Sequence, residues 1–436
     1  MDNGMKGLRD WLFDRLNKRF FFGWVILATT SFTMIGTGPG QSHLIGLYFD
    51  PIGKEMTSFF AIDWMQSNRQ TALAYAYGIA TFLAAFLLPK MGKLLDRHGP
   101  ATMLWIVLGC LGLTALLFSL VTDWVTIAIG FGFLRFLGQG ALMLACVNMV
   151  SQWFDRRRGL ALGIMSLGFP ISMAVHPPLC QWLMDLVGWR TSWLWLGLST
   201  LVLFLPAALL LAHSKPEPLG LQPDGDQRQQ TADATTPVWG LTRLEALRTP
   251  AFYIITVGLF CLSSLVTTLH VFFKSILTTH GLDAQVATMM FTISGITAAI
   301  SMPIVGLMLD RCRTDWMFSG GLIIMTASLI SITLVNDLPS AIMFAIIFGL
   351  NNGVTMTFFG FLWPRYFGRK HLGSIQGVGQ MVGIIGASIG AIPLAIAIDQ
   401  FGDYDRTLQV LAVLPVAAAV LALFLRHPQS GHAKTH

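Results

Sequence analysis

The chain has 436 residues, of which 54% are hydrophobic and only 11% are charged, and its mean hydropathy is +0.64. A soluble domain of this size does not have such a composition, so the sequence indicates a membrane protein. The formal net charge is +6, from 28 Lys and Arg residues against 22 Asp and Glu residues. No catalytic or nucleotide-binding motif accompanies this composition, which argues against an enzyme and against direct ATP drive.

A charged tail, residues 1–19, precedes the first long apolar run. Apolar and basic side chains alternate in it at near-helical spacing, namely Trp11, Leu12, Phe13 and Leu16 with Arg9, Arg15, Lys18 and Arg19. This pattern predicts a short amphipathic helix on the cytoplasmic membrane surface. A disordered basic tail would have the same composition, and the sequence leaves both alternatives open.

Apolar runs recur along the rest of the chain, and each is long enough as a helix to cross about 30 Å of hydrocarbon. We therefore predict an all-α membrane protein with twelve transmembrane helices. The predicted spans are residues 20–48, 70–89, 101–121, 124–150, 159–184, 190–212, 250–277, 284–308, 316–335, 338–362, 372–398 and 407–425.

The five cysteines lie in or beside these runs without pairing or metal-ligand spacing. They are Cys110, Cys146, Cys180, Cys261 and Cys312. We expect them to be inert core residues, and we expect neither a metal site nor a cofactor.

The basic residues predict the orientation of the chain. Most Lys and Arg residues fall in the loops on the same side as the N-terminus, and cytoplasmic loops are enriched in these residues. Both termini should therefore be cytoplasmic, in a multi-pass protein of the cytoplasmic (inner) membrane. This topology, together with attraction to anionic lipid, accounts for the positive net charge without a nucleic-acid partner.

The two halves of the chain repeat each other. GKLLDR at Gly92 to Arg97 recurs as GLMLDR at Gly306 to Arg311, and other landmarks recur at the same offset. This repeat predicts two pseudo-symmetric six-helix bundles, which suits a secondary transporter. The expected segments are a cytoplasmic tail 1–19, an N-terminal bundle 20–212, a cytoplasmic linker 213–248, a C-terminal bundle 249–426 and a cytoplasmic tail 427–436.

These motifs carry a family resemblance. The segment GKLLDRHG, Gly92 to Gly99, resembles the loop signature of the major facilitator superfamily. WFDRRRGLALGIMSLG, Trp153 to Gly168, is similar to the boundary between helices 4 and 5 in the monocarboxylate-porter and oxalate/formate-antiporter branch. The predicted span 284–308 lacks the Asp and Arg that monocarboxylate porters carry there. The resemblance implies the major facilitator fold and alternating access.

The loop signature also supplies candidate gating residues. Asp96 follows a helix end, where its carboxylate can pair with a cation or a helix N-terminus in one state and lose that partner in another. The gating candidates are Asp96 and Arg97, their repeats Asp310 and Arg311, and the run Arg156, Arg157 and Arg158. The alternative is that these charges only anchor the loops to the lipid surface.

Polar residues inside the predicted spans are neutral or cationic, because all acidic residues fall in loops or at helix ends. A charge at this depth costs about 3 kcal/mol or more, so Arg135 in the middle of the fourth span is a candidate for binding an anion. The other candidate substrate-binding residues are Thr37, Gln41, His43, His176, His270, Lys274, Asn351 and Asn352. Each candidate also has a structural alternative. Backbone carbonyls could satisfy Arg135, His176 could cap a proline kink, and Lys274 could extend to the outer surface. Asn351 and Asn352 could hold helices together.

The first span contains the unusual stretch IGTGPGQSHLIG, residues 35–46. Pro39 removes an amide donor, and Gly36, Gly40 and His43 would share one face of a helix. We predict a hinge at Gly36, Pro39 and Gly40 that brings this face close to a substrate, although a glycine packing seam would have the same sequence.

Together these features predict a secondary active transporter that moves a small organic anion, of mono- or dicarboxylate type, by alternating access. The sequence leaves open proton symport and anion exchange, so protons or a counter-anion are the expected coupled partners. The alternative function is an exporter of amphiphilic drugs or siderophores. We expect a monomer whose other partners are membrane lipids.

Overall fold

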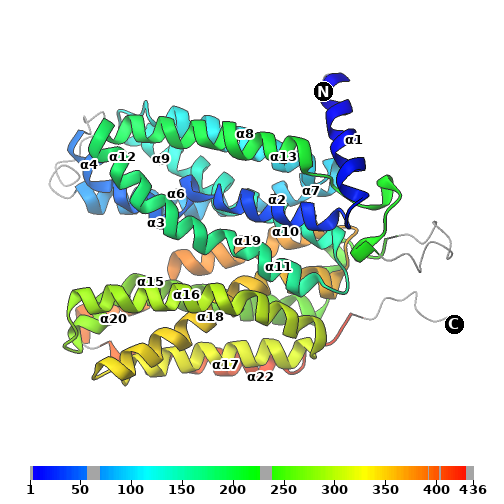
Figure 1. Ribbon diagram of the computed structural model, residues 1–436. Coiled ribbons are helices and arrows are strands. Elements are labelled where there is room, and N and C mark those ends of the chain that lie inside the picture. Colours follow the sequence, from blue (N-terminus) through cyan, green and yellow to red (C-terminus); the bar gives the residue numbers. More distant parts are fainter. Residues whose placement is uncertain (1–2, 56–68, 226–237, 391, 402–403, 429–436) are drawn as a thin grey trace. The chain divides into compact units, whose positions relative to one another are not determined.

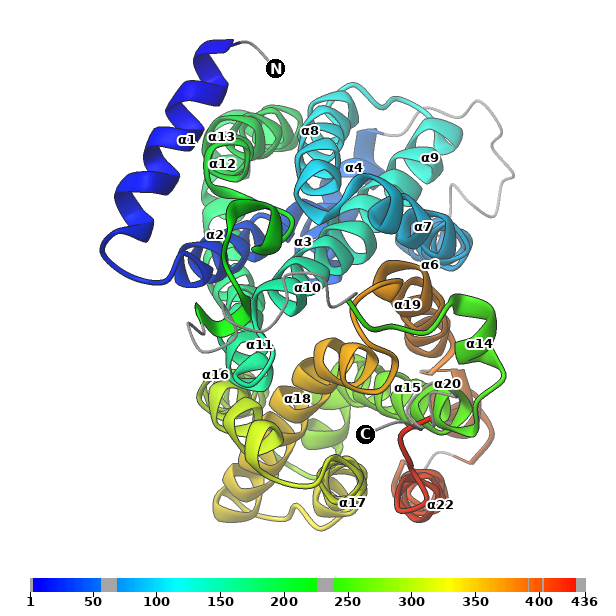
Figure 2. The ribbon, with the colours of Figure 1, turned by 90° about the vertical axis from the view of Figure 1, so that its right-hand side faces the viewer.

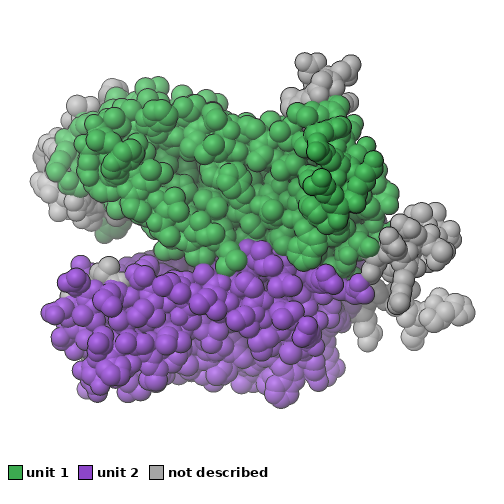
Figure 3. All heavy atoms as spheres, viewed as in Figure 1, with its two compact units in different colours: residues 1–155, 165–237, 376–378 green, residues 156–164, 238–375, 379–436 purple. Residues whose placement is uncertain are grey.

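The structure is a computed structural model of the chain, and it describes residues 3–55, 69–225, 238–390, 392–401 and 404–428. The chain forms two compact units, which Figure 3 shows in separate colours. Unit 1 comprises residues 1–155, 165–237 and 376–378, and unit 2 comprises residues 156–164, 238–375 and 379–436. Regular structure in the described ranges is helical, apart from an isolated β-bridge between Gly240 and Gly368.

Unit 1 begins with a helix followed by a broken span (Figure 1). The elements are α1 (Asn3–Asn17), α2 (Gly23–Ile35), the 3₁₀ turn η1 (Gly38–Gly40), α3 (Ser42–Ile45), the 3₁₀ turn η2 (Gly46–Tyr48) and α4 (Phe49–Glu55). Helix α1 confirms the helical alternative for the N-terminal tail. The span breaks at Gln41, whose backbone is extended with φ −98° and ψ 143°. Proline and glycine immediately before this residue weaken the helix there.

The rest of unit 1 is a helical bundle. Its elements are α6 (Arg69–Ala85), α7 (Leu88–His98), α8 (Pro100–Phe118), α9 (Trp124–Leu134), the π-helix η3 (Arg135–Ala141), α10 (Leu142–Trp153), α12 (Gly168–Ser199), the π-helix η4 (Thr200–Phe204) and α13 (Leu205–Leu211). Helix α11 (Arg158–Ser166) lies mostly among the residues of unit 2. A buried aromatic cluster of Tyr48, Phe118, Phe131 and Trp193 joins four of these elements.

Unit 2 contains most of the remaining helices. They are α14 (Arg243–Leu247), α15 (Pro250–Thr279), α16 (Ala284–Arg311), α17 (Thr314–Thr333), α18 (Leu338–Phe367), α19 (Leu372–Ile389), α20 (Ile392–Phe401), α21 (Asp405–Leu411) and α22 (Val413–Ala422). Glycines let these helices pack closely: a Cβ atom on Gly258 would lie 2.4 Å from the Phe318 ring. Phe318 in turn packs edge-on against Phe358, with 5.2 Å between ring centroids.

Among the described residues, nine helices are long and apolar enough to cross a membrane, or ten if the bent pair 75–85 and 88–98 is one span. One of the nine covers residues 158–211, and Gly188 breaks it with a φ of 79°, which only glycine adopts easily. Counting the bent pair as one span, dividing this helix at Gly188 and adding the broken first span at residues 23–48 gives the twelve predicted spans. The predicted all-α fold is confirmed.

The predicted bundles 20–212 and 249–426 lie mostly in unit 1 and unit 2, respectively, with residues 156–164 and 376–378 grouped the other way. Residues 226–237 of the predicted linker lie outside the described residues. The described parts of the linker include two 3₁₀ turns, Glu217–Leu219 and Pro223–Gly225, and helix α14.

Candidate functional site

Arg135 is the first residue of the π-helix η3, inside the fourth span, and is 5% exposed. Its Nε donates to Thr81 Oγ1 at 3.1 Å, and its Nη1 donates to the Gly40 carbonyl at 2.9 Å. The guanidinium also lies 5.0 Å from the centroid of the Tyr77 ring. Among the residues that the structure describes, Arg135 has no carboxylate partner. It is therefore a buried cation held by neutral groups, at a π-helical turn of the kind that often marks functional sites.

The break in the first span supplies the carbonyl that Arg135 binds. Because Gln41 is extended, the chain leaves its helical path immediately after Gly40. The approach of this segment to η3 requires glycine, since a Cβ atom on Gly40 would lie 2.3 Å from the Leu134 carbonyl oxygen and 2.7 Å from Gly138 Cα. The sequence predicted that Gly36, Gly40 and His43 share one helix face, and this prediction is wrong because α2 ends at Ile35 and the extended Gln41 separates His43 from the two glycines.

Two histidines lie beside this break. The His176 ring occupies the space beside Gly38, where an added Cβ atom would be 2.8 Å from the ring. His176 Nδ1 lies 3.0 Å from Ser172 Oγ, and the ring is 6% exposed. His43 packs edge-on against Phe169 at 5.9 Å, and its Nε2 is buried without a hydrogen-bond partner among the described residues. A buried nitrogen without a partner is costly, so it is available to a ligand or a proton.

We call Arg135, Tyr77, Thr81, His43 and His176 the arginine cluster, which lies wholly within unit 1. His43 lies on α3, directly after the extended Gln41, and Arg135 binds the Gly40 carbonyl directly before it. Tyr77 is attached to the break through its hydroxyl, which lies 2.7 Å from Ser42 Oγ. The cluster thus brings two imidazoles, one phenol and one guanidinium around the broken helix, without an acidic group among the described residues.

The sequence missed Tyr77 and Thr81. These two residues lie four apart on α6, so they share a helix face, and the Thr81 hydroxyl donates to the Tyr77 carbonyl at 2.8 Å. Two polar side chains four residues apart in an apolar span are the sequence pattern that could have identified them as site residues.

The remaining candidates in the first span have structural contacts. Thr37 is buried and donates its hydroxyl to the Met34 carbonyl at 2.7 Å. Gln41 is 6% exposed. Gly36 packs against Phe204, where a Cβ atom would be 2.9 Å from the ring. Whether Pro39 acts as a hinge stays a prediction.

The candidates in unit 2 form a separate group. His270 Nδ1 lies 2.8 Å from the Val266 carbonyl oxygen, and Phe291 and Phe348 lie beside the His270 ring. Asn351 donates to the Met325 sulfur at 3.2 Å, and its Oδ1 is buried without a partner among the described residues. Asn352 is half-buried, whereas Lys274 is exposed.

The gating candidate Asp310, at the end of α16, caps helix α11 within unit 2. Its Oδ1 accepts from the Gly159 amide at 2.6 Å, and its Oδ2 accepts from the Leu160 amide at 2.9 Å. The two helices touch at glycines, since a Cβ atom on Gly159 would lie 2.2 Å from the Gly306 carbonyl oxygen. A carboxylate is stabilised at a helix N-terminus by the unsatisfied amides and the helix dipole.

The other gating candidates differ in exposure. Arg158, which begins α11, is 4% exposed. Asp96 is half-buried, and the exposed members are Arg97, Arg156, Arg157 and Arg311. The sequence predicted a cation or a helix N-terminus as the partner of Asp96, and its repeat Asp310 contacts a helix N-terminus. Whether these residues act as gates stays a prediction.

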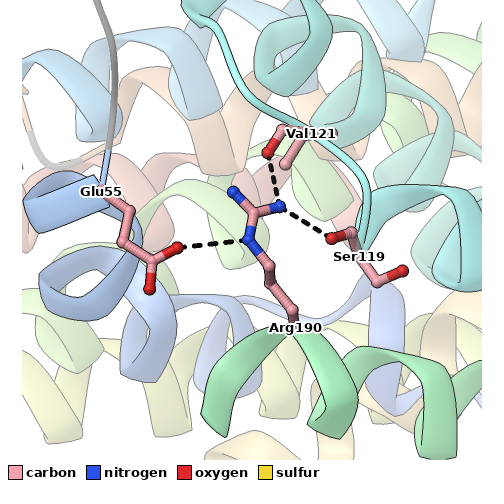
Figure 4. Close-up of polar contacts among 4 residues, drawn as sticks. All are labelled: Glu55, Ser119, Val121 and Arg190. Carbon is pink, nitrogen blue, oxygen red and sulfur yellow. Dashed lines mark hydrogen bonds and ion pairs between the residues drawn. The ribbon is translucent and has the colours of Figure 1, made fainter.

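Arg190, on α12, binds the loop that follows α8 (Figure 4). Its Nη1 donates to the Ser119 and Val121 carbonyls, both at 2.8 Å, and its Nε lies 3.2 Å from a Glu55 carboxylate oxygen. The guanidinium also lies 4.3 Å from the Trp189 ring centroid. A cation is well placed at a helix C-terminus, where carbonyls lack partners. Arg190 was not among the candidate residues from the sequence.

Comparisons with known proteins identify the family. The sequence matches the Major Facilitator Superfamily over residues 44–277 and 257–436. It is 23% identical to Monocarboxylate transporter 2 of Homo sapiens over 426 residues, which are 92% of this chain and 85% of that protein. It is 31% identical to Monocarboxylate transporter 11 of Homo sapiens over 192 residues, which are 44% of this chain and only 38% of that protein.

Two solved structures share the fold. The human organic anion transporter MFSD10 (TETRAN) gives a TM-score of 0.70 at 13% identity, covering 92% of this chain and 99% of that one. The Escherichia coli fucose:proton symporter FucP gives a TM-score of 0.68 at 15% identity, covering 92% and 98%. The predicted resemblance to the monocarboxylate-porter branch is confirmed by the curated relatives. The chain is a multi-pass membrane protein and belongs to the major facilitator superfamily.

Proposed function

We propose that this protein is a secondary active transporter that moves a small organic anion of mono- or dicarboxylate type by alternating access. The observation that carries the proposal is the burial of Arg135 without a carboxylate partner among the described residues. An unneutralised guanidinium at this depth costs about 3 kcal/mol or more, and a bound carboxylate would offset this cost. The names of the monocarboxylate transporters among the relatives support the same class of substrate.

The surroundings of Arg135 favour an anion over a cation. The guanidinium uses Nε and Nη1 for Thr81 and Gly40, and its Nη2 donates to none of the described residues. A carboxylate is recognised by guanidinium N–H groups through charge-assisted hydrogen bonds. The unpartnered Nε2 of His43 and the Tyr77 phenol add further polar groups of the same cluster.

Two coupling mechanisms fit this cluster. In proton symport, an anion bound beside Arg135 would favour a proton on the nearby His43 imidazole, so that proton and anion bind together. Anion exchange needs no titrating group. Uptake into proteoliposomes with a pH indicator distinguishes them, because only symport acidifies the compartment that receives the anion.

Alternating access is supported by the contact of Asp310 with the start of α11. A carboxylate that caps a helix only while two elements touch stabilises one conformational state relative to another. Asp310→Asn should therefore slow transport by about tenfold, the equivalent of 1.4 kcal/mol, and leave substrate affinity within a few-fold. Normal turnover of this variant would instead assign Asp310 to loop anchoring.

The most direct test of the substrate class is a thermal-shift screen of the purified protein against matched pairs of carboxylates and their amides. Carboxylates should stabilise the protein and the amides should not, because an amide has the same shape without the charge. Stabilisation by amphiphilic cations or siderophores alone would replace the organic-anion proposal by the exporter alternative. The orientation, with both termini cytoplasmic in the inner membrane, is tested separately by cysteines placed in the linker and labelled from either side.

A further inference from the structure

Helix α1 is attached to the bundle through Arg9 and Phe13. Arg9 donates to the carbonyl of Ala212, and its guanidinium lies 5.1 Å from the Trp105 ring centroid. Phe13 packs against Phe22 at 4.9 Å and against His213 at 5.6 Å. A basic residue and an aromatic residue therefore fix α1 to unit 1, while the large apolar residue Trp11 does not take part.

The opposite face of α1 carries a strip of two apolar and two basic residues. Leu8 and Trp11 are 47% and 51% exposed, and Arg15 and Lys18 are exposed beside them. Lys18 directly follows the last residue of α1, and its amide still donates to the Asp14 carbonyl at 3.3 Å. At 100° per residue the four side chains therefore fall within an arc of about 80°. The Arg15 guanidinium lies 5.0 Å from the Trp11 ring centroid, which holds it on this strip. The exposed acidic residues Asp10 and Asp14 lie to one side of it.

The attachment of α1 fixes its depth relative to two spans. Ala212 directly follows the last residue of α13, and Trp105 lies in the second turn of α8. Helix α1 therefore lies where these spans end, which is where hydrocarbon gives way to lipid headgroups. Figure 1 shows α1 crosswise to α2, α8 and α13, and Figure 2 shows it passing outside α13.

We propose that the strip Leu8, Trp11, Arg15 and Lys18 binds anionic phospholipid headgroups, with α1 lying in the membrane interface. Trp is enriched at this level because its ring has an apolar body and a polar edge. Arg15 and Lys18 reach headgroup phosphates while their stems cover apolar surface. Each cation near an anionic surface should raise the affinity for that surface by about fivefold. The bound lipid would then hold α1, and through Phe22 the start of the broken first span, in place.

The test uses the full chain reconstituted in vesicles of phosphatidylcholine alone or mixed with phosphatidylglycerol. Because the chain has 13 Trp residues, the signal of Trp11 is taken as the difference between the parent and Trp11→Phe. This difference should be quenched by bromine-labelled lipid, and more strongly when phosphatidylglycerol carries the label. Arg15→Gln with Lys18→Gln should abolish the preference for phosphatidylglycerol.

The matched control is Arg243→Gln with Arg248→Gln, which removes the same charge from α14 and its C-cap and should keep the preference. Quenching of the parent's Trp11 by aqueous iodide, without quenching by labelled lipid, would overturn the proposal. The strip would then face water or bind a protein partner. Equal quenching by both labelled lipids would overturn the anionic specificity. Both readouts are independent of the transported substrate, so they stand or fall separately from the proposed function.

Discussion

Arg135 and Arg190 donate to backbone carbonyls in the same unit but differ in their charge partners. Arg135 binds the Gly40 carbonyl and Thr81, and no carboxylate in the described part of the chain accompanies them. Arg190 binds the Ser119 and Val121 carbonyls and also pairs with Glu55. In both regions an arginine binds carbonyls at a break or an end of a helix, but of the two only Arg190 has a carboxylate partner among the described residues.

The two arginines also differ in how far their side chains are buried. Arg135 is 5% exposed, whereas the Arg190 side chain is 36% exposed and its partner Glu55 is 51% exposed. Water can solvate Arg190 when Glu55 is removed, but it cannot replace a missing partner of Arg135 to the same extent. Arg190 is thus suited to hold helix ends together, and Arg135 is suited to receive an anion.

The largest expected effect comes from Arg135→Gln. Removing one partner of a buried charge-assisted contact costs about 3 kcal/mol, so carboxylate affinity should fall by about 100-fold or more. Arg135→Lys should restore part of this affinity, since a point charge remains while the planar geometry is lost. The measurement is calorimetric binding on equal amounts of folded protein. If Arg135→Gln binds carboxylates as tightly as the parent, Arg135 is structural like Arg190, and the comparison fails.

Arg190→Gln should have the reverse profile. It removes hydrogen bonds from a charged donor to two carbonyls, so the free energy of unfolding should fall by about 2 kcal/mol while carboxylate affinity stays unchanged. Thermal unfolding in detergent and binding at a temperature below the transition measure the two quantities. Loss of affinity at unchanged stability would place Arg190 in the substrate path.

The sequence predicted what depends on local pattern. Hydropathy located the spans, including the boundary near Gly188, and depth within a span identified Arg135 as a candidate. The partners of Arg135 could not be predicted, because Gly40 and Thr81 are far from it in sequence and meet it only through packing. Arg190 was missed for the same reason, since the carbonyls that it binds lie in the loop after α8 and meet it only through packing.

A third arginine, Arg9, lies at the other end of α8, near Trp105, and also binds a backbone carbonyl, that of Ala212. The next residue, His213, is titratable and packs against Phe13. Burial, with a contribution from the Arg9 charge, lowers the pKa of His213 from 6.5 to about 4. The neutral imidazole is therefore the form that packs against Phe13, and this stability is complete above pH 6.5 and is lost as the pH falls toward 4. The loss should reach up to about 1 kcal/mol for each pH unit below 6.5.

Hydrogen exchange of the α1 amides measures this pH dependence. His213→Phe keeps an aromatic ring against Phe13 and should remove the pH dependence between pH 6.5 and 5. Undiminished pH dependence in this variant would assign it to another group.

The smallest expected effect belongs to Glu55→Gln, and it separates the two contributions at Arg190. The Arg190–Glu55 pair is partly exposed, with 3.2 Å between Nε and the carboxylate oxygen. Pairs of this kind contribute about 0.2–1 kcal/mol, and salt screens them. Glu55→Gln should therefore lower the unfolding free energy by less than about 1 kcal/mol, and the difference from the parent should shrink as salt is raised.

Arg190→Gln, measured beside it, should retain most of its larger effect in salt, since the two carbonyl bonds do not depend on Glu55. If Glu55→Gln cost as much as Arg190→Gln, the carboxylate would be what makes Arg190 tolerable in the fold. An arginine with no carboxylate, such as Arg135, would then need its bound anion for folding as well as for transport.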